Sequence, residues 1–163
     1  MKKYLLVWVV MILVTCPVLS QIRRKSLYDP YTDAVGQIEE AVDSAGSLNK
    51  HVLIQVGGDW CSWCIKLHEF IREHPQVDSL ILADYVFIRV NYSKENKNPE
   101  AMQLLDLPQR FGFPVLVVLN DEGKRIHTQN TAYLEAGTTY DEKKITGFLK
   151  AWNKKALDPD LYK

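Results

Sequence analysis

Apolar residues along this chain form two kinds of pattern, which alternate along the sequence. Spacing of three and four residues, which is typical of one buried helix face, covers residues 34–45, 61–73 and 142–152. Short runs rich in branched apolar residues, which are typical of buried strands, lie between these segments. The predicted strands are residues 51–56, 85–90, 115–119 and 125–129, and a further short helix is predicted over residues 99–105. This alternation predicts an α/β fold in which helices cover both faces of a mixed sheet.

Polar residues, glycine and proline mark the ends of these elements. Asp33 and Asp141 precede helical patterns and are predicted to be N-caps. Gly46 is predicted to end the first helix, and Pro75 to end the second. The last two strands are joined by a turn at residues 120–123 and should be antiparallel, whereas the first two are joined by a helix and should be parallel.

The first twenty residues have a different character. Lys2 and Lys3 precede an apolar run that continues to Val14, and small residues stand before a cut after Ser20. This is the layout of a secretory signal peptide. We therefore expect residues 1–20 to be removed, residues 21–32 to form a linker or leading arm, and residues 33–163 to form one domain in the periplasm or outside the cell.

Two alternatives to cleavage stay open. The uncharged stretch from Tyr4 to Ile22 approaches the length that spans a bilayer, so it could serve as a membrane anchor, although Pro17 lies within it. Cys16 could instead carry a lipid. All three alternatives carry the domain across a membrane.

Charge and cysteine content narrow the classes of function. The chain has 163 residues, with 20 Lys and Arg against 20 Asp and Glu, so it lacks the basic surplus expected of a nucleic-acid-binding protein. Three cysteines are too few for a disulfide scaffold, so a hydrophobic core must stabilise the domain. Loss of the segment that holds Cys16 would leave Cys61 and Cys64.

These two cysteines form the one motif that carries evident chemistry. Trp60-Cys61-Ser62-Trp63-Cys64 follows a predicted strand and opens a predicted helix. Free backbone N–H groups and the helix dipole stabilise a thiolate at a helix N-terminus. We therefore expect Cys61 to be the exposed nucleophile and Cys64, one turn further, to be the more buried resolving thiol.

Two other roles for the cysteine pair stay open. A purely structural disulfide would close a very short loop and add only about 2 kcal/mol in the chain-entropy model. A metal could bind Cys61, Cys64 and His68, which share one helix face, but no fourth ligand is evident in the sequence. The strand-to-helix setting favours redox chemistry.

Three segments in the expected order resemble the thioredoxin superfamily. They are GDWCSWC after a strand, RFGFPVLVVLNDEGKRI further on, and the last amphipathic helix, so the resemblance covers residues 33–152. It is nearest to secreted thioredoxin-like proteins with a WCxWC motif, and it implies a three-layer α/β/α sandwich with a mixed central sheet. It also implies that Pro114 is a cis-proline facing the cysteines, and that the Phe113 backbone can pair with a substrate peptide by strand addition. The residues alone would favour an ordinary trans proline entering a strand.

Aromatic side chains beside the cysteines are the expected substrate contacts. Trp60 is predicted to pack under the active-site loop, and Trp63 to be exposed. Both are predicted to bind substrate together with Phe113 and Pro114. The polar segment 130–140 is predicted to be a solvated loop. His51, His74 and His127 are predicted to be surface groups.

The sequence differs from the thioredoxin pattern at residues close to the two cysteines. Gln55 stands where the resemblance implies a buried acid that relays a proton to the resolving thiol. Either Asp59, Lys66 or a water molecule then replaces that acid, or turnover is slow. Ser62 and Trp63 also replace the usual residues between the cysteines, so the direction of redox exchange is not inherited.

We expect a thiol–disulfide oxidoreductase that acts on protein disulfides outside the cytoplasm, as a reductase more than as an oxidase. The Cys61–Cys64 pair would be its redox centre, with no metal or organic cofactor. A reductase there would need a membrane protein as its electron donor, and we expect a monomer that binds no nucleic acid. The alternative is a non-catalytic binding or chaperone module with an inert disulfide, suggested by Trp63 and the 130–140 segment.

Overall fold

The computed structural model describes residues 26–163, so the predicted signal peptide and its possible cleavage lie outside the described residues. Four strands form the central sheet in the order β2-β1-β3-β4. They are β1 (His51–Gly57), β2 (Tyr85–Asn91), β3 (Val115–Leu119) and β4 (Arg125–Asn130). β1 is parallel to β2, and β3 is antiparallel to β4, as the pattern predicted. β1 is also antiparallel to β3.

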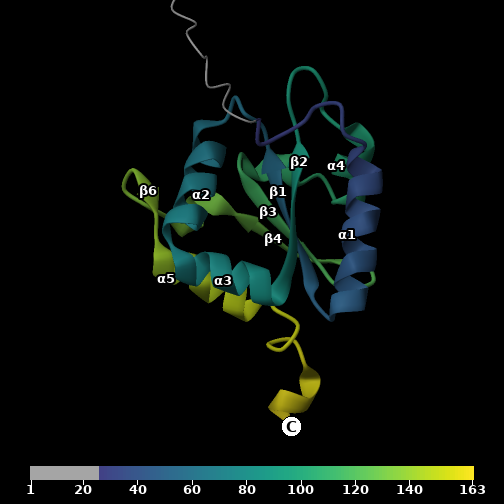
Figure 1. The fold of residues 1–163 in the computed structure, drawn as a ribbon, viewed down its shortest axis with the longest axis vertical. Coiled ribbons are helices and arrows are strands. Elements are labelled where there is room, and N and C mark those ends of the chain that lie inside the picture. Colours follow the sequence, from purple (N-terminus) through teal and green to yellow (C-terminus); the bar gives the residue numbers. More distant parts are fainter. Residues whose placement is uncertain (1–25) are drawn as a thin grey trace, which may run out of the picture.

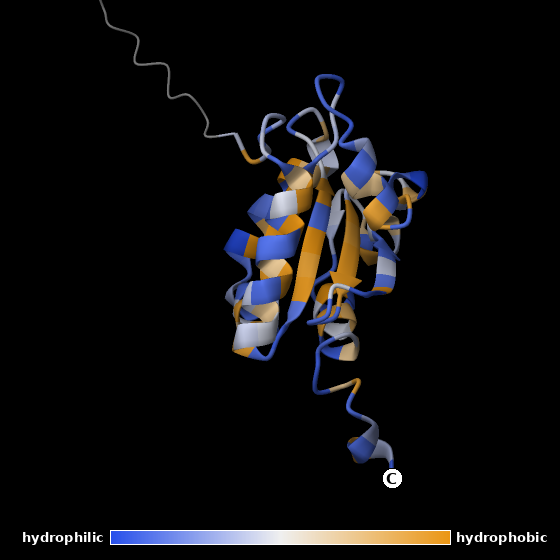
Figure 2. Ribbon diagram, turned by 90° about the vertical axis from the view of Figure 1, so that its right-hand side faces the viewer, coloured by the Kyte–Doolittle hydropathy of each residue, from blue (hydrophilic) through white to orange (hydrophobic). Residues whose placement is uncertain are grey.

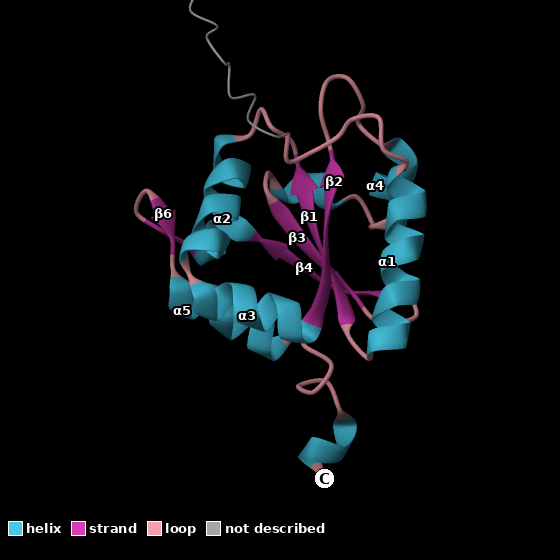
Figure 3. Ribbon diagram, in the orientation of Figure 1, coloured by secondary structure: helices cyan, strands magenta, loops and turns pink. Residues whose placement is uncertain are grey.

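Helices cover both faces of this sheet (Figures 1 and 3). One face carries α1 (Ala34–Leu48) and α4 (Pro99–Leu104). The other carries α2 (Ser62–Glu73), α3 (Pro75–Asp84) and α5 (Glu142–Ala151). The three-layer α/β/α architecture expected from the resemblance is confirmed.

Alternation along β1 divides the core into two layers. Val52, Ile54 and Val56 pack on the side of α1, whereas Leu53 packs on the side of α2 and α3. Every residue of β1 is buried, because the strand is central and helices cover both of its faces. Figure 2 shows the hydrophobic strands between helices whose outer faces are hydrophilic.

The predicted caps are confirmed, but one helix end is not. The carboxylate of Asp33 accepts hydrogen bonds from the N–H groups of Val35 and Gly36, and Asp141 caps α5 in the same manner. The prediction that Gly46 ends the first helix is wrong, because α1 continues to Leu48. Asn49 ends it instead, in the left-handed region with a φ of 56°.

Helix α3 was not predicted. Pro75 does end α2, but it also occupies the first turn of α3, where a proline lacks no needed hydrogen bond. The helix buries Val77 and Ile81, four residues apart, against the core. Two buried positions in such a short helix give too weak a periodicity to detect.

The 130–140 segment is not a solvated loop, so that prediction is wrong. It forms a 3-10 helix at Thr131–Leu134 and a small hairpin of β5 (Glu135–Ala136) and β6 (Thr139–Tyr140). Three of its side chains are buried: Thr131, Leu134 and Tyr140. The segment therefore belongs to the folded core.

The leading arm is also part of the folded unit over residues 26–32. Tyr28 is only 3% exposed and packs beside both cysteines. The hydroxyl of Ser26 and the N–H of Leu27 donate hydrogen bonds to the carboxylate of Asp59. The arm is therefore held against the loop that leads into α2.

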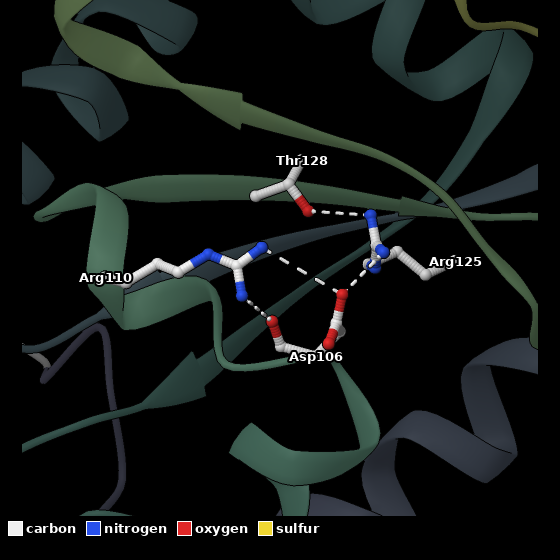
Figure 4. A network of polar contacts seen from close by, with 4 residues as sticks. All are labelled: Asp106, Arg110, Arg125 and Thr128. Atoms are coloured by element: carbon white, nitrogen blue, oxygen red, sulfur yellow. Dashed lines mark hydrogen bonds and ion pairs between the residues drawn. The ribbon is translucent and has the colours of Figure 1, made fainter.

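A polar network holds the turn between α4 and β3 (Figure 4). Asp106 and Leu107 are consecutive residues in the left-handed region, with φ of 61° and 51°. Arg110 donates to the backbone carbonyl of Asp106, and Arg125 of β4 donates to its carboxylate at 2.6 Å. Arg125 also donates to the hydroxyl of Thr128. The network links this turn to β4 on the neighbouring edge of the sheet.

Three histidines were predicted to be surface groups. The prediction of a surface position is wrong for His51, which is 4% exposed because its Nδ1 lies 2.9 Å from the carbonyl of Trp152 in a buried contact. His127 stacks on Trp152, and His74 stacks on Phe70; both are half-buried. No helix within residues 26–163 is both long and apolar enough to cross a membrane.

We predict that Ile81→Ala destabilises the fold far more than Leu82→Ala. Ile81 is 3% exposed and its loss leaves a cavity, so the free energy of unfolding should fall by about 2 to 4 kcal/mol. Leu82 is 64% exposed on the same helix and should change stability by less than about 0.5 kcal/mol. Denaturant unfolding followed by circular dichroism measures both values. Equal effects of the two variants would contradict the packing of α3.

Candidate active site

The site forms where the first turn of α2 meets the end of β1. Cys61 is the N-cap of α2, and its Sγ accepts a hydrogen bond from the Cys64 N–H at 3.2 Å. Cys61 and Cys64 form a disulfide, with their Cα atoms 5.2 Å apart. The pair thus sits where the free N–H groups and dipole of α2 can stabilise a thiolate.

Cys64 is more buried than Cys61, as predicted. Cys64 is fully buried, and Cys61 is 6% exposed. The prediction that Cys61 is exposed is therefore wrong for this oxidised form. Phe113, Trp63 and the arm around Tyr28 pack against the pair and cover it.

Pro114 follows a cis peptide bond and is buried. The resemblance is thus confirmed on this point over the trans proline that the residues alone favoured. Phe113 packs directly against the cysteine cluster. The hydroxyl of Thr131 donates to the carbonyl of Pro114 at 2.5 Å, so the 130–140 segment holds this loop.

The two tryptophans have the opposite of their predicted positions. Trp60 is 58% exposed rather than packed under the loop. Its Nε1 donates to the carbonyl of Tyr92, and its ring makes an edge contact with Phe113, so the ring is held in this exposed position. Trp63 is half-buried rather than exposed. Its ring makes an edge contact with Tyr140, with centroids 5.3 Å apart.

The 130–140 segment covers the Trp63 side of α2. The hydroxyl of Tyr140 donates to the carbonyl of Trp63 at 3.2 Å, and burial raises the pKa of this tyrosine. Lys66 Nζ lies 4.4 Å from the centre of the Trp63 ring and donates to the carbonyl of Thr138. The same segment therefore supports both the cysteine helix and the cis-proline loop.

The groups expected to replace a buried acid are engaged elsewhere. Asp59 accepts from Ser26 and Leu27, and Lys66 is held over Trp63. Gln55 is fully buried, and its side-chain amide donates to the carbonyl of Cys64 at 3.3 Å. Neither Asp59 nor Lys66 is therefore positioned by these contacts to take the place of that acid.

His68 faces a cation rather than a metal site. Its Nδ1 lies 3.1 Å from the guanidinium of Arg89, and a guanidinium can only donate, so Nδ1 accepts. Burial and the positive charge of Arg89 both lower the pKa of His68 and favour its neutral form. Within residues 26–163, no group of three or more His, Cys, Asp or Glu side chains could hold a metal ion.

A mostly apolar groove of about 510 Å³ lies beside the site. Trp60 and Tyr92 form part of its wall, and the loop from Ser93 to Lys97 forms the rest. Tyr92 also packs against Phe113, with ring centroids 4.9 Å apart. The groove is thus connected to the cis-proline loop through aromatic contacts.

Several residues at the site had no role in the sequence interpretation. Tyr28 packs against Cys64, Arg89 contacts His68 one turn further along α2, and Thr131 and Tyr140 brace the loops. One signal for Arg89 was available in the sequence, namely a charge inside an apolar strand pattern. The other contacts join segments that are distant in the sequence.

Comparison with known proteins places this chain in a family. A family model described as thioredoxin-like matches residues 33–121, more than half of the chain. The chain belongs to this thioredoxin-like family.

Two curated relatives share part of the sequence. Disulfide bond reductase DsbH of Chlamydia pneumoniae is 28% identical over 93 residues, which cover 53% of this chain and 56% of that protein. Thiol:disulfide interchange protein DsbD of Photorhabdus laumondii is 27% identical over 94 residues, which cover 58% of this chain and 16% of that protein. The chain spans about half of the first relative and a small part of the second.

Solved structures agree on the fold. A disulphide isomerase from Xylella fastidiosa Temecula1 has a TM-score of 0.67 at 25% identity, over 76% of this chain and 93% of that one. A structure described as a DsbH oxidoreductase has a TM-score of 0.54 at 21% identity, over 76% of this chain and 82% of that one, which supports the fold alone.

We predict that Gly57→Ala destabilises the oxidised protein by about 1 to 3 kcal/mol. A Cβ on Gly57 would lie 2.5 Å from Cys64 Sγ and 3.0 Å from the Tyr28 hydroxyl, so the helix or the arm must shift. Gly147→Ala is the control, because its Cβ would meet nothing within 4 Å on α5 and should add about 0.5 to 1 kcal/mol. Thermal unfolding of the two variants should shift in opposite directions; an unchanged midpoint for Gly57→Ala would contradict the close contact.

Proposed function

We propose that this protein is a thiol–disulfide oxidoreductase that acts on disulfides of other proteins. The observation that carries the proposal is the disulfide between Cys61, at the N-terminus of α2, and Cys64, packed beside the cis-proline loop. The names of the two curated relatives and of the Xylella structure all refer to disulfide chemistry, which supports the same activity.

The geometry suggests a division of roles between the two thiols. In the reducing direction, the Cys61 thiolate attacks a substrate disulfide, forms a mixed disulfide and releases one substrate thiolate. Cys64 then attacks Cys61 Sγ, which releases the second substrate thiolate and closes the enzyme disulfide. Cys61 is suited to the first step because it is the N-cap of α2 and the less buried cysteine.

We favour the reductase direction and a location outside the cytoplasm. The name of the Chlamydia relative supports reduction, and the signal-like residues 1–20 support export with cleavage after Ser20. A reductase in an oxidising compartment needs a membrane protein that supplies electrons, and the similarity to DsbD is consistent with such a partner. We further propose that residues 26–163 work as a single folded monomer.

The exposed aromatic residues define the proposed substrate surface. Trp60 and Phe113 lie between the disulfide and the apolar groove, and the Phe113 backbone could pair with an extended peptide beside Pro114. Trp63 is covered by Tyr140 and Lys66, so we now assign it to support of the helix rather than to substrate contact.

Replacement of the two cysteines should separate their roles. Cys61→Ser should abolish reduction of a protein disulfide, because no nucleophile remains at the helix N-terminus. Cys64→Ser should accumulate a mixed disulfide at Cys61, because the resolving thiol is missing. Non-reducing electrophoresis with mass spectrometry detects the trapped species.

These variants also test the alternative of a binding module. If Cys61→Ser keeps full activity, the mechanism is wrong. If the chain binds unfolded proteins equally well with both cysteines replaced by serine and never exchanges disulfides, the binding module replaces the enzyme. Equilibration of the Cys61–Cys64 pair with a thiol buffer gives its reduction potential, and a potential near that of thioredoxin supports the reductase direction.

Trp60→Ala should raise KM for a protein disulfide by about five- to tenfold, because truncation removes an exposed aromatic contact beside the groove. A small disulfide that cannot reach the groove should be reduced at the normal rate. Tyr133→Ala is the matched control, since Tyr133 is 74% exposed on the 3-10 helix of the 130–140 segment and does not line this groove. Equal KM values for Trp60→Ala and the unaltered protein would exclude this substrate surface.

A further inference from the structure

Two residues in contact with Cys64, and a third that contacts α2 one turn further along, carry a buried polar atom without a hydrogen-bond partner. The part of the chain that the structure describes holds four such side-chain atoms, and three of them are Tyr28 Oη, Gln55 Oε1 and Arg89 Nε. Buried polar atoms are almost always hydrogen-bonded, so each exception asks for an explanation. These unpaired atoms suggest that a hydrogen-bond partner for them appears only during the reaction.

Tyr28 and Cys64 are direct neighbours. Cys64 Sγ lies 2.5 Å, and the Tyr28 hydroxyl 3.0 Å, from the same point, the position where a Cβ of Gly57 would stand. Both residues belong to one buried cluster. The absence of a side chain at Gly57 therefore leaves the tyrosine hydroxyl beside the sulfur.

Arg89 brings a positive charge to the same region. It pairs in register with Gln55, whose amide donates to the carbonyl of Cys64. Among residues 26–163, no carboxylate forms an ion pair with Arg89, and its side-chain contacts are the neutral His68 and the ring of Phe87. A partly buried guanidinium without an anion is unfavourable. Gln55, where an acid could have stood, offers no negative charge.

We infer that Tyr28 and Arg89 stabilise Cys64 as a thiolate: Tyr28 by donating its hydroxyl hydrogen to the sulfur, and Arg89 by its positive charge. Cys64 is the group beside this cluster that becomes an anion when the disulfide opens. The inference rests on the proposed function and deepens it, because it assigns to these two residues the control of the resolving thiol. Tyr28 and Arg89 lower the pKa of the Cys64 thiol and do not relay its proton, which is the role that the resemblance implied for a buried acid.

The chemistry of the resolving step balances as follows. The Cys64 thiol first loses its proton, which ends on a departing substrate thiolate through solvent. The Cys64 thiolate donates an electron pair to Cys61 Sγ, the new Cys61–Cys64 bond forms, and the bond from Cys61 to the substrate sulfur breaks. The substrate cysteine leaves with that electron pair and is reduced, while the enzyme pair is oxidised. Tyr28 and Arg89 keep their protons throughout.

The surrounding charges are compatible with this role. Three titratable groups act on Tyr28: Arg89 of β2, Asp59 of the loop before α2, and Tyr140 of β6. His68 of α2 is in turn influenced by Arg89. Burial raises the pKa of Tyr28 above its usual range; Arg89 and the nearby side-chain amide of Gln55 lower this pKa, whereas Asp59 and Tyr140 raise it further. Tyr28 is therefore an O–H donor throughout the physiological pH range.

The test is the pKa of Cys64 in the full chain that carries Cys16→Ser and Cys61→Ser, where Cys64 is the single remaining thiol. Ultraviolet absorbance of the thiolate against pH gives this pKa without any substrate. Tyr28→Phe should raise it by about one unit, a tenfold fall in the thiolate fraction below the pKa. Arg89→Met should raise it as well, whereas Arg89→Lys should retain most of the effect because the charge is kept.

Tyr85→Phe is the matched control. Tyr85 is also 3% exposed, but its hydroxyl donates to the carbonyl of Leu149 at the opposite end of β2. This variant should lose stability and leave the Cys64 pKa unchanged. Near-ultraviolet circular dichroism checks that each variant is folded; Tyr28→Phe removes one hydroxyl and keeps the buried ring.

An unchanged pKa in Tyr28→Phe overturns the role of Tyr28, and so does an equal shift in Tyr28→Phe and Tyr85→Phe, which would indicate general loosening. An unchanged pKa in Arg89→Met overturns the role of Arg89. Because the titration needs no turnover, an inactive but normally titrating protein would contradict the proposed function alone.

Discussion

The site depends on the close approach of the first turn of α2 to the end of β1. Gly57 permits this contact, because any side chain there would collide with Cys64 Sγ. The approach places Cys61 at the helix N-terminus and buries Cys64 against the strand. Two thiols with the same chemistry thereby acquire different surroundings, which is what an attacking and a resolving cysteine require.

A second constraint joins the two halves of the site. The 130–140 segment donates one hydrogen bond to the Pro114 carbonyl from Thr131 and another to the Trp63 carbonyl from Tyr140. The cis-proline loop and the cysteine helix are therefore held by the same short segment. Its buried residues explain why it cannot be an ordinary surface loop, and they place it among the elements that fix the geometry of a proposed exchange reaction.

The polar groups near Cys64 differ in charge. Gln55 is neutral, Tyr28 is a donor and Arg89 is a cation, so the described residues near the resolving sulfur favour an anion there. The exposed side of the disulfide is instead aromatic, with Trp60, Phe113 and the adjoining apolar groove. Under the two proposals above, one side would control the thiol and the other would bind the substrate.

Local patterns were sufficient for most of the fold. The strand runs, the caps at Asp33 and Asp141 and the strand directions depend on neighbouring residues and short connections, and all are confirmed. The cysteine motif predicts redox chemistry for the same reason. Its setting before a helix is local, so the roles of Cys61 and Cys64 could be expected from spacing alone.

The errors arose where distant segments meet. Trp60 and Trp63 exchanged their expected exposures because Tyr92 and Tyr140, remote in the sequence, decide which ring is covered. The burial of Tyr28 beside Cys64 likewise requires the arm to fold back onto the sheet. Hydrophobic period and capping are properties of a short stretch of chain, whereas burial and hydrogen-bond partners at the site are properties of packing between stretches, and only the tertiary structure determines them.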